Sequence, residues 1–137
     1  MLEAIYVLDK SSGICLASYE IVKQTQSGDI LSAFFLAALE FCKDQFHSTI
    51  HSIVAENKIV VLHDGSKIVL AGIIEKTDNP QSAAIFLEDI EREFLSIYER
   101  QIENYRGNVT VFRFFDPGKI LGHLVYQRII EESLAAL

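Results

Sequence analysis

The sequence predicts an α+β fold: an α-β-α sandwich whose five-stranded, mainly antiparallel sheet has one helix on one face and two on the other. The predicted element order is strand-strand-helix-strand-strand-strand-helix-helix. The first two strands are apolar on both sides, which is typical of a sheet that is covered on both faces. The 137 residues suit one compact domain and contain no repeat, low-complexity tract or obvious linker, so we expect a single domain over residues 1–137.

The first two strands are predicted over residues 3–9 and 14–22, joined by the loop Asp9-Lys10-Ser11-Ser12-Gly13. A loop with Lys, Ser and Gly after a strand is also found in phosphate-binding sites. Such a site requires the spacing G-x-x-x-x-G-K-[ST] and leads into a helix, whereas here Lys10 precedes the only glycine and Gly13 leads into a β-type run. The loop is therefore predicted to be a hairpin turn, and any nucleotide that matters to the function is expected to be bound by a partner.

The first helix is predicted from Ile30 to about Phe46, with Asp29 as its N-cap. Apolar residues occupy nearly its whole circumference, so it is buried against more than one surface or offers an apolar strip to a partner. Five residues are more apolar than one face of a sheet requires: Leu31, Phe34, Phe35, Ala38 and Leu39. We predict that they form a dimer or partner interface together with an exposed edge strand. The alternative, in which all five belong to the intramolecular core, stays open.

Three further strands are predicted over residues 49–56, 59–63 and 67–75. The first of them turns at Asn57-Lys58 and the second at Asp64-Gly65. Asp-Gly between two β-rich runs is a strong hairpin signal, because both residues can take positive φ.

The second helix is predicted to open with Asn79 as cap and Pro80 as its first residue. Its apolar residues recur at helical spacing and its opposite side is charged; the apolar set is Phe86, Ile90, Phe94, Ile97, Ile102 and Tyr105. The helix is predicted to stop at Arg106-Gly107. An extended aromatic segment over 109–115, which packs on the core or offers an apolar surface, and a last helix that begins at Asp116-Pro117 complete the chain.

The composition argues against several classes of function. A net charge of -7 is opposite to the basic face of a nucleic-acid-binding protein. The N-terminus lacks the basic segment and following apolar stretch that are typical of a signal peptide. The longest apolar run, 30–39, is shorter than the roughly 20 residues that span a bilayer. Cys15 and Cys42 lie among apolar residues, which predicts that both are buried thiols in a protein of a reducing compartment. We therefore expect a cytoplasmic domain without a transmembrane segment.

No pattern of residues predicts an active site. His47 and His51 are four residues apart, but a helix-to-strand transition lies between them and no third metal ligand has convincing spacing. No serine lies in a G-x-S-x-G elbow. The carboxylates between Glu88 and Glu103 have arginine neighbours, which is typical of a solvated helix face. We expect no catalytic residue, metal or cofactor.

The order of the elements, read with the residues that form them, resembles the longin family, close kin of the roadblock domains. The resemblance covers roughly residues 3 to 135 and rests on the stretches IYVLDKSSGICLAS, DILSAFFLAALEFCKDQF, TIHSIVAENKIVVLHDGSKIVLAGIIE and QSAAIFLEDIEREFLSIYERQIENYRGN. Roadblock domains generally begin with a helix, whereas this chain begins with a strand, which favours longin. Longin motifs are patterns of apolar positions, so no functional residue is carried over from the family.

The resemblance implies a non-enzymatic interaction scaffold. Longin-like domains occur in vesicle-trafficking SNAREs, adaptor subunits, tethering complexes and exchange-factor subunits, and they commonly bind small Ras-like GTPases, partner longins or short peptides. It therefore implies a free-standing longin-like protein in trafficking-like or GTPase-regulatory machinery, with a GTPase, a longin or roadblock subunit or a second copy as partner. Any membrane association would then occur only through partners. The alternative is a small-ligand sensor, which would need a pocket with convergent polar groups.

Overall fold

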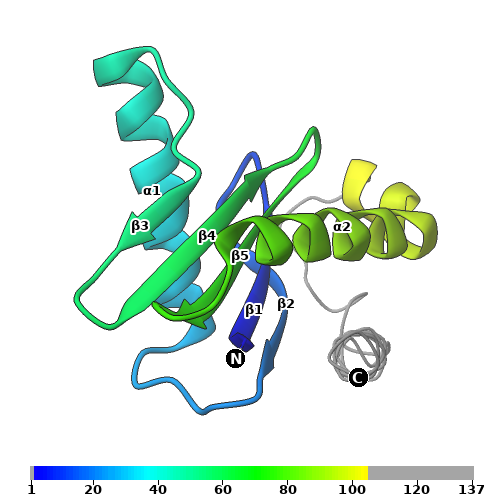
Figure 1. Cartoon of the computed structure of the whole chain (residues 1–137). Helices are drawn as coiled ribbons and strands as arrows, with labels where there is room; N and C mark the ends of the chain where they lie inside the picture. Colours follow the sequence, from blue (N-terminus) through cyan, green and yellow to red (C-terminus); the bar gives the residue numbers. More distant parts are fainter. Residues whose placement is uncertain (1, 105–137) are drawn as a thin grey trace.

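A five-stranded antiparallel sheet forms the centre of the structure, a computed structural model that describes residues 2–104 (Figure 1). The elements are β1 (Leu2–Asp9), β2 (Cys15–Glu20), α1 (Gly28–Phe46), β3 (Ser52–Val54), β4 (Lys58–Asp64), β5 (Ile68–Glu75) and α2 (Pro80–Glu103). The predicted α+β class and the order of these seven elements are confirmed. The predicted helix end at Arg106-Gly107, the extended segment 109–115 and the last helix lie outside the described residues.

The strand order is β2-β1-β5-β4-β3, and every neighbouring pair is antiparallel. The central strand β5 and its neighbour β1 are the longest, with eight residues each. The first hairpin and the later meander of three strands therefore join through the pairing of β1 with β5. This arrangement leaves β2 at one edge of the sheet and β3 at the other.

The two faces of the sheet carry two separate apolar clusters, which explains why β1 and β5 are apolar on both sides. Successive side chains of a strand point to opposite faces. In β1, Tyr6 and Leu8 pack with Phe35 and Leu39 of α1. Ile5 and Val7, which alternate with them, belong to the cluster that α2 covers, and the α2 members are Phe86, Leu87, Ile90, Phe94, Tyr98 and Ile102. The predicted coverage of both faces is confirmed for α1 and α2.

The loop between β1 and β2 is a hairpin turn, as predicted, and its own side chains close it. Asp9 Oδ2 accepts hydrogen bonds from Ser11 Oγ (2.8 Å), Ser12 N (3.0 Å) and Ser12 Oγ (2.7 Å). Gly13 has a φ of 76°, a left-handed conformation that glycine adopts without strain. The only lysine of the loop, Lys10, donates to Gly65 O of the other hairpin (2.8 Å).

The hairpin between β4 and β5 forms where it was predicted, but the reason given for its glycine is wrong. Asp64 lies within β4, and Gly65 N donates to Ile68 O (3.0 Å), so Ser66 and Lys67 form the tip. Among the described residues only His47 and Gly13 have positive φ. Gly65 is needed for space instead: a Cβ there would lie 1.8 Å from Glu91 Oε2 and 2.6 Å from Ile68 O.

The start of α1 differs from the prediction. Ser27, and not Asp29, is the N-cap, since its Oγ accepts a hydrogen bond from Ile30 N (3.3 Å) and the helix begins at Gly28. Asp29 lies in the first turn, where its charge favours the positive end of the helix dipole. At the other end, His47 takes the left-handed conformation, with a φ of 53°, and its N–H donates to Lys43 O (3.0 Å).

The start of α2 is confirmed, whereas β3 is shorter than predicted. Asn79 Oδ1 accepts from Gln81 N (2.9 Å), and Pro80 is the first helical residue. The strand predicted over 49–56 is paired only from Ser52 to Val54, because Ala55 N already donates to Lys58 O (2.8 Å) across the turn.

Candidate interaction surface

The outer side of α1 exposes large apolar side chains. Ile30, Phe34, Phe41 and Phe46 are 58%, 56%, 60% and 59% exposed. Ile30, Phe34 and Phe41 are joined by the exposed Ala37 into a series with spacings of four, three and four, which places them along one side of a helix. We call Ile30, Phe34, Ala37 and Phe41 the α1 stripe. Contiguous exposed apolar surface of this kind is typical of interaction sites.

The structure separates the five predicted interface residues between the stripe and the core. Phe34 lies on the α1 stripe. Phe35 and Leu39 are 2% and 1% exposed and pack against the sheet. Leu31 and Ala38 are partly buried between the two sides.

The prediction from sequence omitted three residues of the stripe, Ile30, Ala37 and Phe41. Their helical spacing was visible in the sequence, since they form a row on a different side of the helix from Phe35 and Leu39. Which of the two apolar series faces the sheet was not visible, because both have helical spacing.

An unpaired strand edge accompanies the α1 stripe. β3 is the last strand of the sheet, and its outer backbone edge has no strand partner within residues 2–104. Ile53 of β3 packs in the same cluster as Phe35 and Leu39, so this strand borders the face that α1 covers. A free edge can accept a strand from another chain through main-chain hydrogen bonds.

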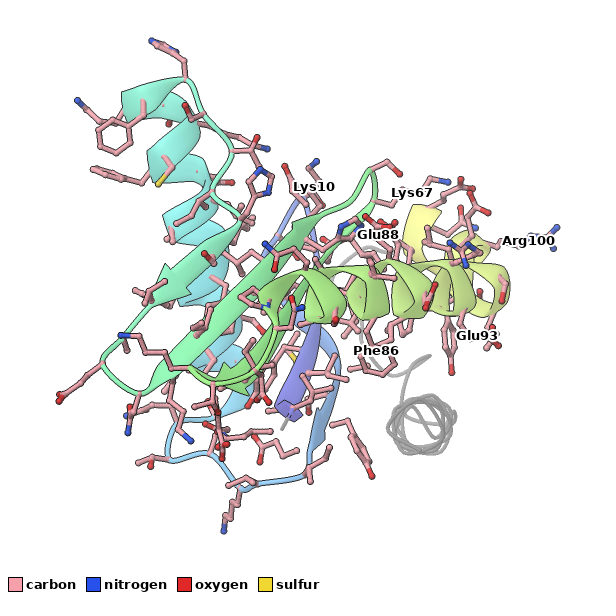
Figure 2. The ribbon with its side chains drawn as sticks, in the orientation of Figure 1. Lys10, Lys67, Phe86, Glu88, Glu93 and Arg100 are labelled. Carbon is pink, nitrogen blue, oxygen red and sulfur yellow. The ribbon has the colours of Figure 1, made fainter. Side chains whose placement is uncertain are left out.

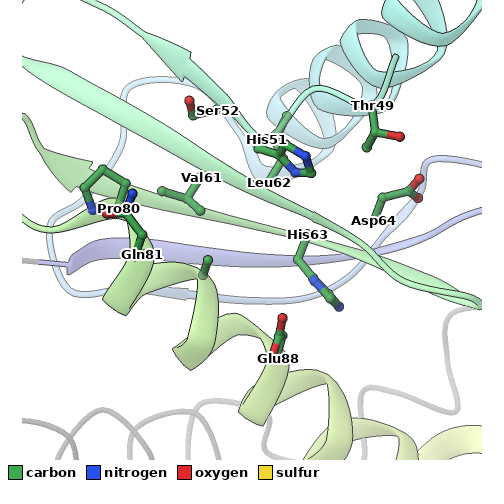
Figure 3. Close-up of a pocket in the computed structure, with 11 residues that line it drawn as sticks. Thr49, His51, Ser52, Val61, Leu62, His63, Asp64, Pro80, Gln81 and Glu88 are labelled. Atoms are coloured by element: carbon green, nitrogen blue, oxygen red, sulfur yellow. The ribbon is translucent and has the colours of Figure 1, made fainter. Parts of the chain in front are cut away.

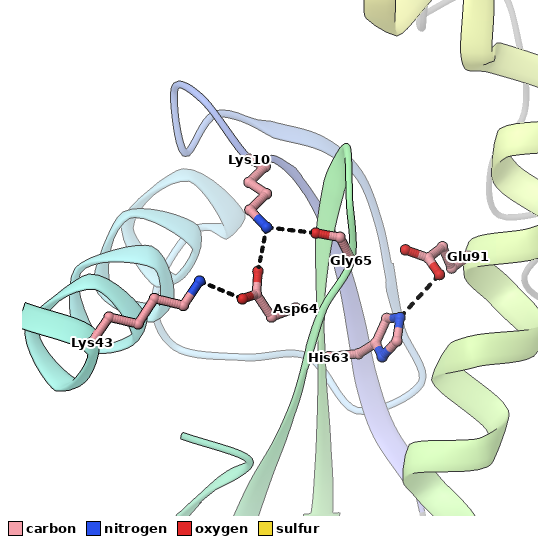
Figure 4. A network of polar contacts seen from close by, with 6 residues as sticks. All are labelled: Lys10, Lys43, His63, Asp64, Gly65 and Glu91. Atoms are coloured by element: carbon pink, nitrogen blue, oxygen red, sulfur yellow. Dashed lines mark hydrogen bonds and ion pairs between the residues drawn. The ribbon is translucent and has the colours of Figure 1, made fainter. Parts of the chain in front are cut away.

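A polar network fixes the C-terminal part of α1 to both hairpins (Figure 4). Asp64 accepts from Lys10 Nζ (3.0 Å) and from Lys43 Nζ of α1 (2.5 Å). Burial acts to raise the pKa of the Asp64 carboxyl, but the hydrogen bonds from Lys43 and Lys10 outweigh it and hold the pKa below its usual value. The charged network therefore helps to position the helix that carries the stripe.

A groove of about 570 Å³ lies along β4, between the 49–52 segment and the first half of α2 (Figure 3). Its lining combines apolar and polar side chains from the 49–52 segment, β4 and α2: Thr49, His51, Ser52, Val61, Leu62, His63, Asp64, Pro80, Gln81, Ala84 and Glu88. Beside it, His63 Nε2 lies 3.0 Å from Glu91 Oε1. We call this feature the α2 groove.

Residues that were considered for catalysis or metal binding have other environments. His47 caps α1, whereas His51 lines the α2 groove. Within residues 2–104, no three His, Cys, Asp or Glu side chains lie close enough to hold a metal ion. Burial raises the pKa of the Cys15 thiol, which favours its protonated, unreactive form. Neither of the two described helices, α1 and α2, has the length and hydropathy of a membrane-spanning segment.

Solved structures with the same arrangement of sheet and helices establish the fold. MglB from Myxococcus xanthus is similar with a TM-score of 0.57 and 15% sequence identity, over 72% of this chain and 85% of that chain. A Roadblock/LC7 domain from Streptomyces avermitilis has a TM-score of 0.53 and 10% identity, over 69% and 86%. The domain has a longin/roadblock-like fold.

Two further similarities extend this result. A chain in the structure of the mammalian SRP receptor is similar to this protein, with a TM-score of 0.55 and 12% sequence identity, over 97% of this chain and 97% of that chain. An MglB structure with a tetrameric arrangement has a TM-score of 0.53 and 14% identity, over 74% and 79%. No protein-family model and no curated protein matches the sequence.

Proposed function

We propose that the protein is a non-enzymatic interaction scaffold of longin type, and that the α1 stripe and the outer edge of β3 form its binding surface. The observation that carries the proposal is the row of exposed side chains on α1. Complete burial of a large apolar side chain contributes about 1.5–3 kcal/mol, so a partner that covers the half-exposed residues gains on the order of 1 kcal/mol from each. The β3 edge adds backbone donors and acceptors that have no strand partner within residues 2–104, and Ile53 of this strand packs against the cluster beneath α1.

The sequence of the stripe supports a second copy of this chain, or another longin or roadblock domain, as one partner. Phe34 and Phe41 stand on either side of the small residues Ala37 and Ala38. Two such helices that pack antiparallel about this centre would place Phe34 of one against Phe41 of the other. Self-complementarity of this kind is what a twofold-symmetric interface requires. The tetrameric arrangement of one MglB structure supports assembly as a use of this fold.

A small Ras-like GTPase is the other class of partner, and the longin resemblance supports it. The loop from Asp9 to Gly13 is closed by its own side chains, and Lys10 is engaged with Asp64 and Gly65. This lysine is therefore already committed, which favours nucleotide binding by the partner. The proposed setting is cytoplasmic GTPase-regulatory or trafficking-like machinery.

The test replaces both aromatic residues of the stripe, in the variant Phe34→Glu/Phe41→Glu. Light scattering after size exclusion should give twice 15.4 kDa for the wild type and 15.4 kDa for the variant. Ile85→Glu is the matched control, because Ile85 is 54% exposed but lies on α2. This control should keep the wild-type mass, and circular dichroism checks that all three proteins are folded.

Pull-downs with small GTPases in both nucleotide states complete the test. Binding that requires the stripe should be lost in the double variant and kept in the Ile85→Glu control. The proposal is wrong if the wild type is a monomer that binds no GTPase. It is also wrong if dimer formation or GTPase binding is unchanged in the double variant.

The α2 groove is the observation that favours the alternative, a small-ligand sensor. Sites for small ligands bury most of the ligand in a mainly apolar cavity. The groove has polar residues, and Thr49, His51, Gln81 and Glu88 of its lining are exposed to solvent. A scaffold therefore fits better. A small molecule that native mass spectrometry finds on the purified protein would reverse this preference.

A further inference from the structure

The α2 groove lies along β4, and its base on the side opposite to α1 is a short apolar floor. Val61 of β4 and Ala84 of α2 line it, and Ser52 extends it to the edge strand. Val61 points to the α2 side because it belongs to the cluster that α2 covers. A floor of this kind suits an aliphatic stem, such as that of Lys or Arg, whose charged head reaches a polar rim.

The wall of the groove that α2 forms carries one charged side chain, Glu88, beside Pro80, Gln81 and Ala84. α2 carries six acidic and two basic residues. Glu88 lines the groove and has no hydrogen-bond or ion-pair partner within the part of the chain that the structure describes. Four basic side chains of the described residues pair with other carboxylates: Lys67 with Glu99 and Glu103, Arg92 with Asp89, and Lys10 and Lys43 with Asp64. Within residues 2–104, the carboxylate of Glu88 therefore has no paired cation.

The end of the groove near His63 is rich in hydrogen-bond acceptors. Figure 3 shows the His63 and Glu88 side chains directed toward the same space. In the neutral tautomer whose Nε2 donates to Glu91 Oε1 at 3.0 Å, the other ring nitrogen, Nδ1, is an acceptor. Glu91 Oε2 is buried without a hydrogen-bond partner, which adds negative charge behind the ring. A donor with positive charge complements this end, whereas a carboxylate would be repelled.

We propose that the α2 groove binds a cationic segment of a protein partner. A Lys or Arg side chain of that segment lies along Val61 and Ala84, and its charged head pairs with Glu88. The open rim beside β3 lets a chain enter and leave, which a small-molecule pocket does not require. This site is separate from the α1 stripe, so one domain presents two binding surfaces.

Selection of random peptides displayed on phage tests the chemistry of the occupant. The wild-type protein is the bait, and the variant Ala84→Arg, which fills the groove, removes peptides that bind elsewhere. Enriched sequences should contain Lys or Arg next to apolar residues. Enrichment of acidic sequences, or no enrichment above an unrelated bait, would show that the proposal is wrong.

Fluorescence anisotropy of the strongest peptide then locates its site. Ala84→Arg should weaken binding by more than about tenfold, through steric exclusion and like charge. Glu88→Gln should weaken it by a few fold, as expected for an exposed ion pair, and the effect should shrink at high salt. The matched control is Glu93→Gln, an exposed residue of the same helix that does not line the groove (Figure 2). It should leave the affinity unchanged.

The variant Phe34→Glu separates this proposal from the proposed function. Peptide affinity should not change in Phe34→Glu, although its mass in solution should. If Phe34→Glu abolishes peptide binding and Ala84→Arg does not, the peptides bind the α1 stripe, and the assignment of the groove fails while the scaffold stands. A small molecule in the groove that displaces the peptide would also overturn the assignment.

Discussion

Phe34 and Phe35 are chemically identical neighbours in α1 with opposite environments. Phe35 is 2% exposed, and its ring centroid lies 6.1 Å from that of Tyr6 in the cluster beneath α1. Phe34 is 56% exposed on the stripe. Replacing each by alanine removes the same atoms, so any difference between the two variants reports the environment alone.

Phe35→Ala should be strongly destabilising and Phe34→Ala nearly neutral. Removal of a buried phenylalanine costs about 3–5 kcal/mol, since both apolar burial and packing are lost. With an unfolding entropy of about 2.1 cal/mol/K per residue over 137 residues, 1 kcal/mol corresponds to about 3.5 °C, so Tm should fall by roughly 10–17 °C. A substitution at an exposed site changes stability by about 0.5 kcal/mol or less, which corresponds to about 2 °C.

The assay is thermal and urea unfolding followed by circular dichroism at two protein concentrations. The concentration series matters because dimer formation adds stability that grows with concentration. In Phe34→Ala this dependence should weaken, while the value at the lower concentration stays near that of the wild type. Equal losses of Tm in the two variants, independent of concentration, would refute the separation of stripe and core.

Three further predictions concern the hairpins and the end of α1. Gly65→Ala should destabilise the protein by about 1–3 kcal/mol in urea unfolding, because the new Cβ overpacks against Glu91 and Ile68 O; adding Glu91→Ala should restore only part of the loss, and full restoration would contradict the backbone clash. His47→Gly should raise the unfolding free energy by up to about 1 kcal/mol, since the left-handed φ of 53° is unfavourable for histidine; a lower urea midpoint would contradict this. The pKa of Asp64 is lowered on folding, so its contribution to stability is present at neutral pH and is lost as pH falls through the folded pKa. Asp64→Asn should therefore be less stable than the wild type at neutral pH and should lose less stability on acidification. If the unfolding free energies of the two proteins change in parallel with pH, the network does not contribute as described.

Elements with strong local signals were predictable from the sequence. Asn79 followed by Pro80 sets the start of α2, because Asn satisfies free backbone donors and Pro needs none. The start of α1 was harder, since Ser27 and Asp29 are both good caps and only the backbone conformation decides between them. The length of β3 depends on its pairing with β4, which local composition does not specify.

The candidate surfaces were less predictable, for two different reasons. An apolar helix has no polar side to indicate its rotation, so Phe34 and Phe35 could not be assigned to surface and core until the sheet was present. The α2 groove joins His51, His63 and Glu88 from three separate segments. Gly65 reads as a turn residue, although its role is to make room for Glu91, 26 positions away. Such long-range contacts leave no local pattern in the sequence.

β3 connects the two proposed surfaces, because alternate side chains of a strand point to opposite faces. Ile53 packs on the α1 side, while Ser52 lines the α2 groove. A partner strand that pairs with the edge of β3 would occupy its backbone and leave the groove open. The contacts that the groove offers to a peptide would then be the same in monomer and dimer, so the coupling free energy between dimer formation and peptide binding should be close to zero. Peptide affinity measured above and below the dimer dissociation constant should therefore be the same, and a difference would mean that pairing at the edge of β3 reaches the groove.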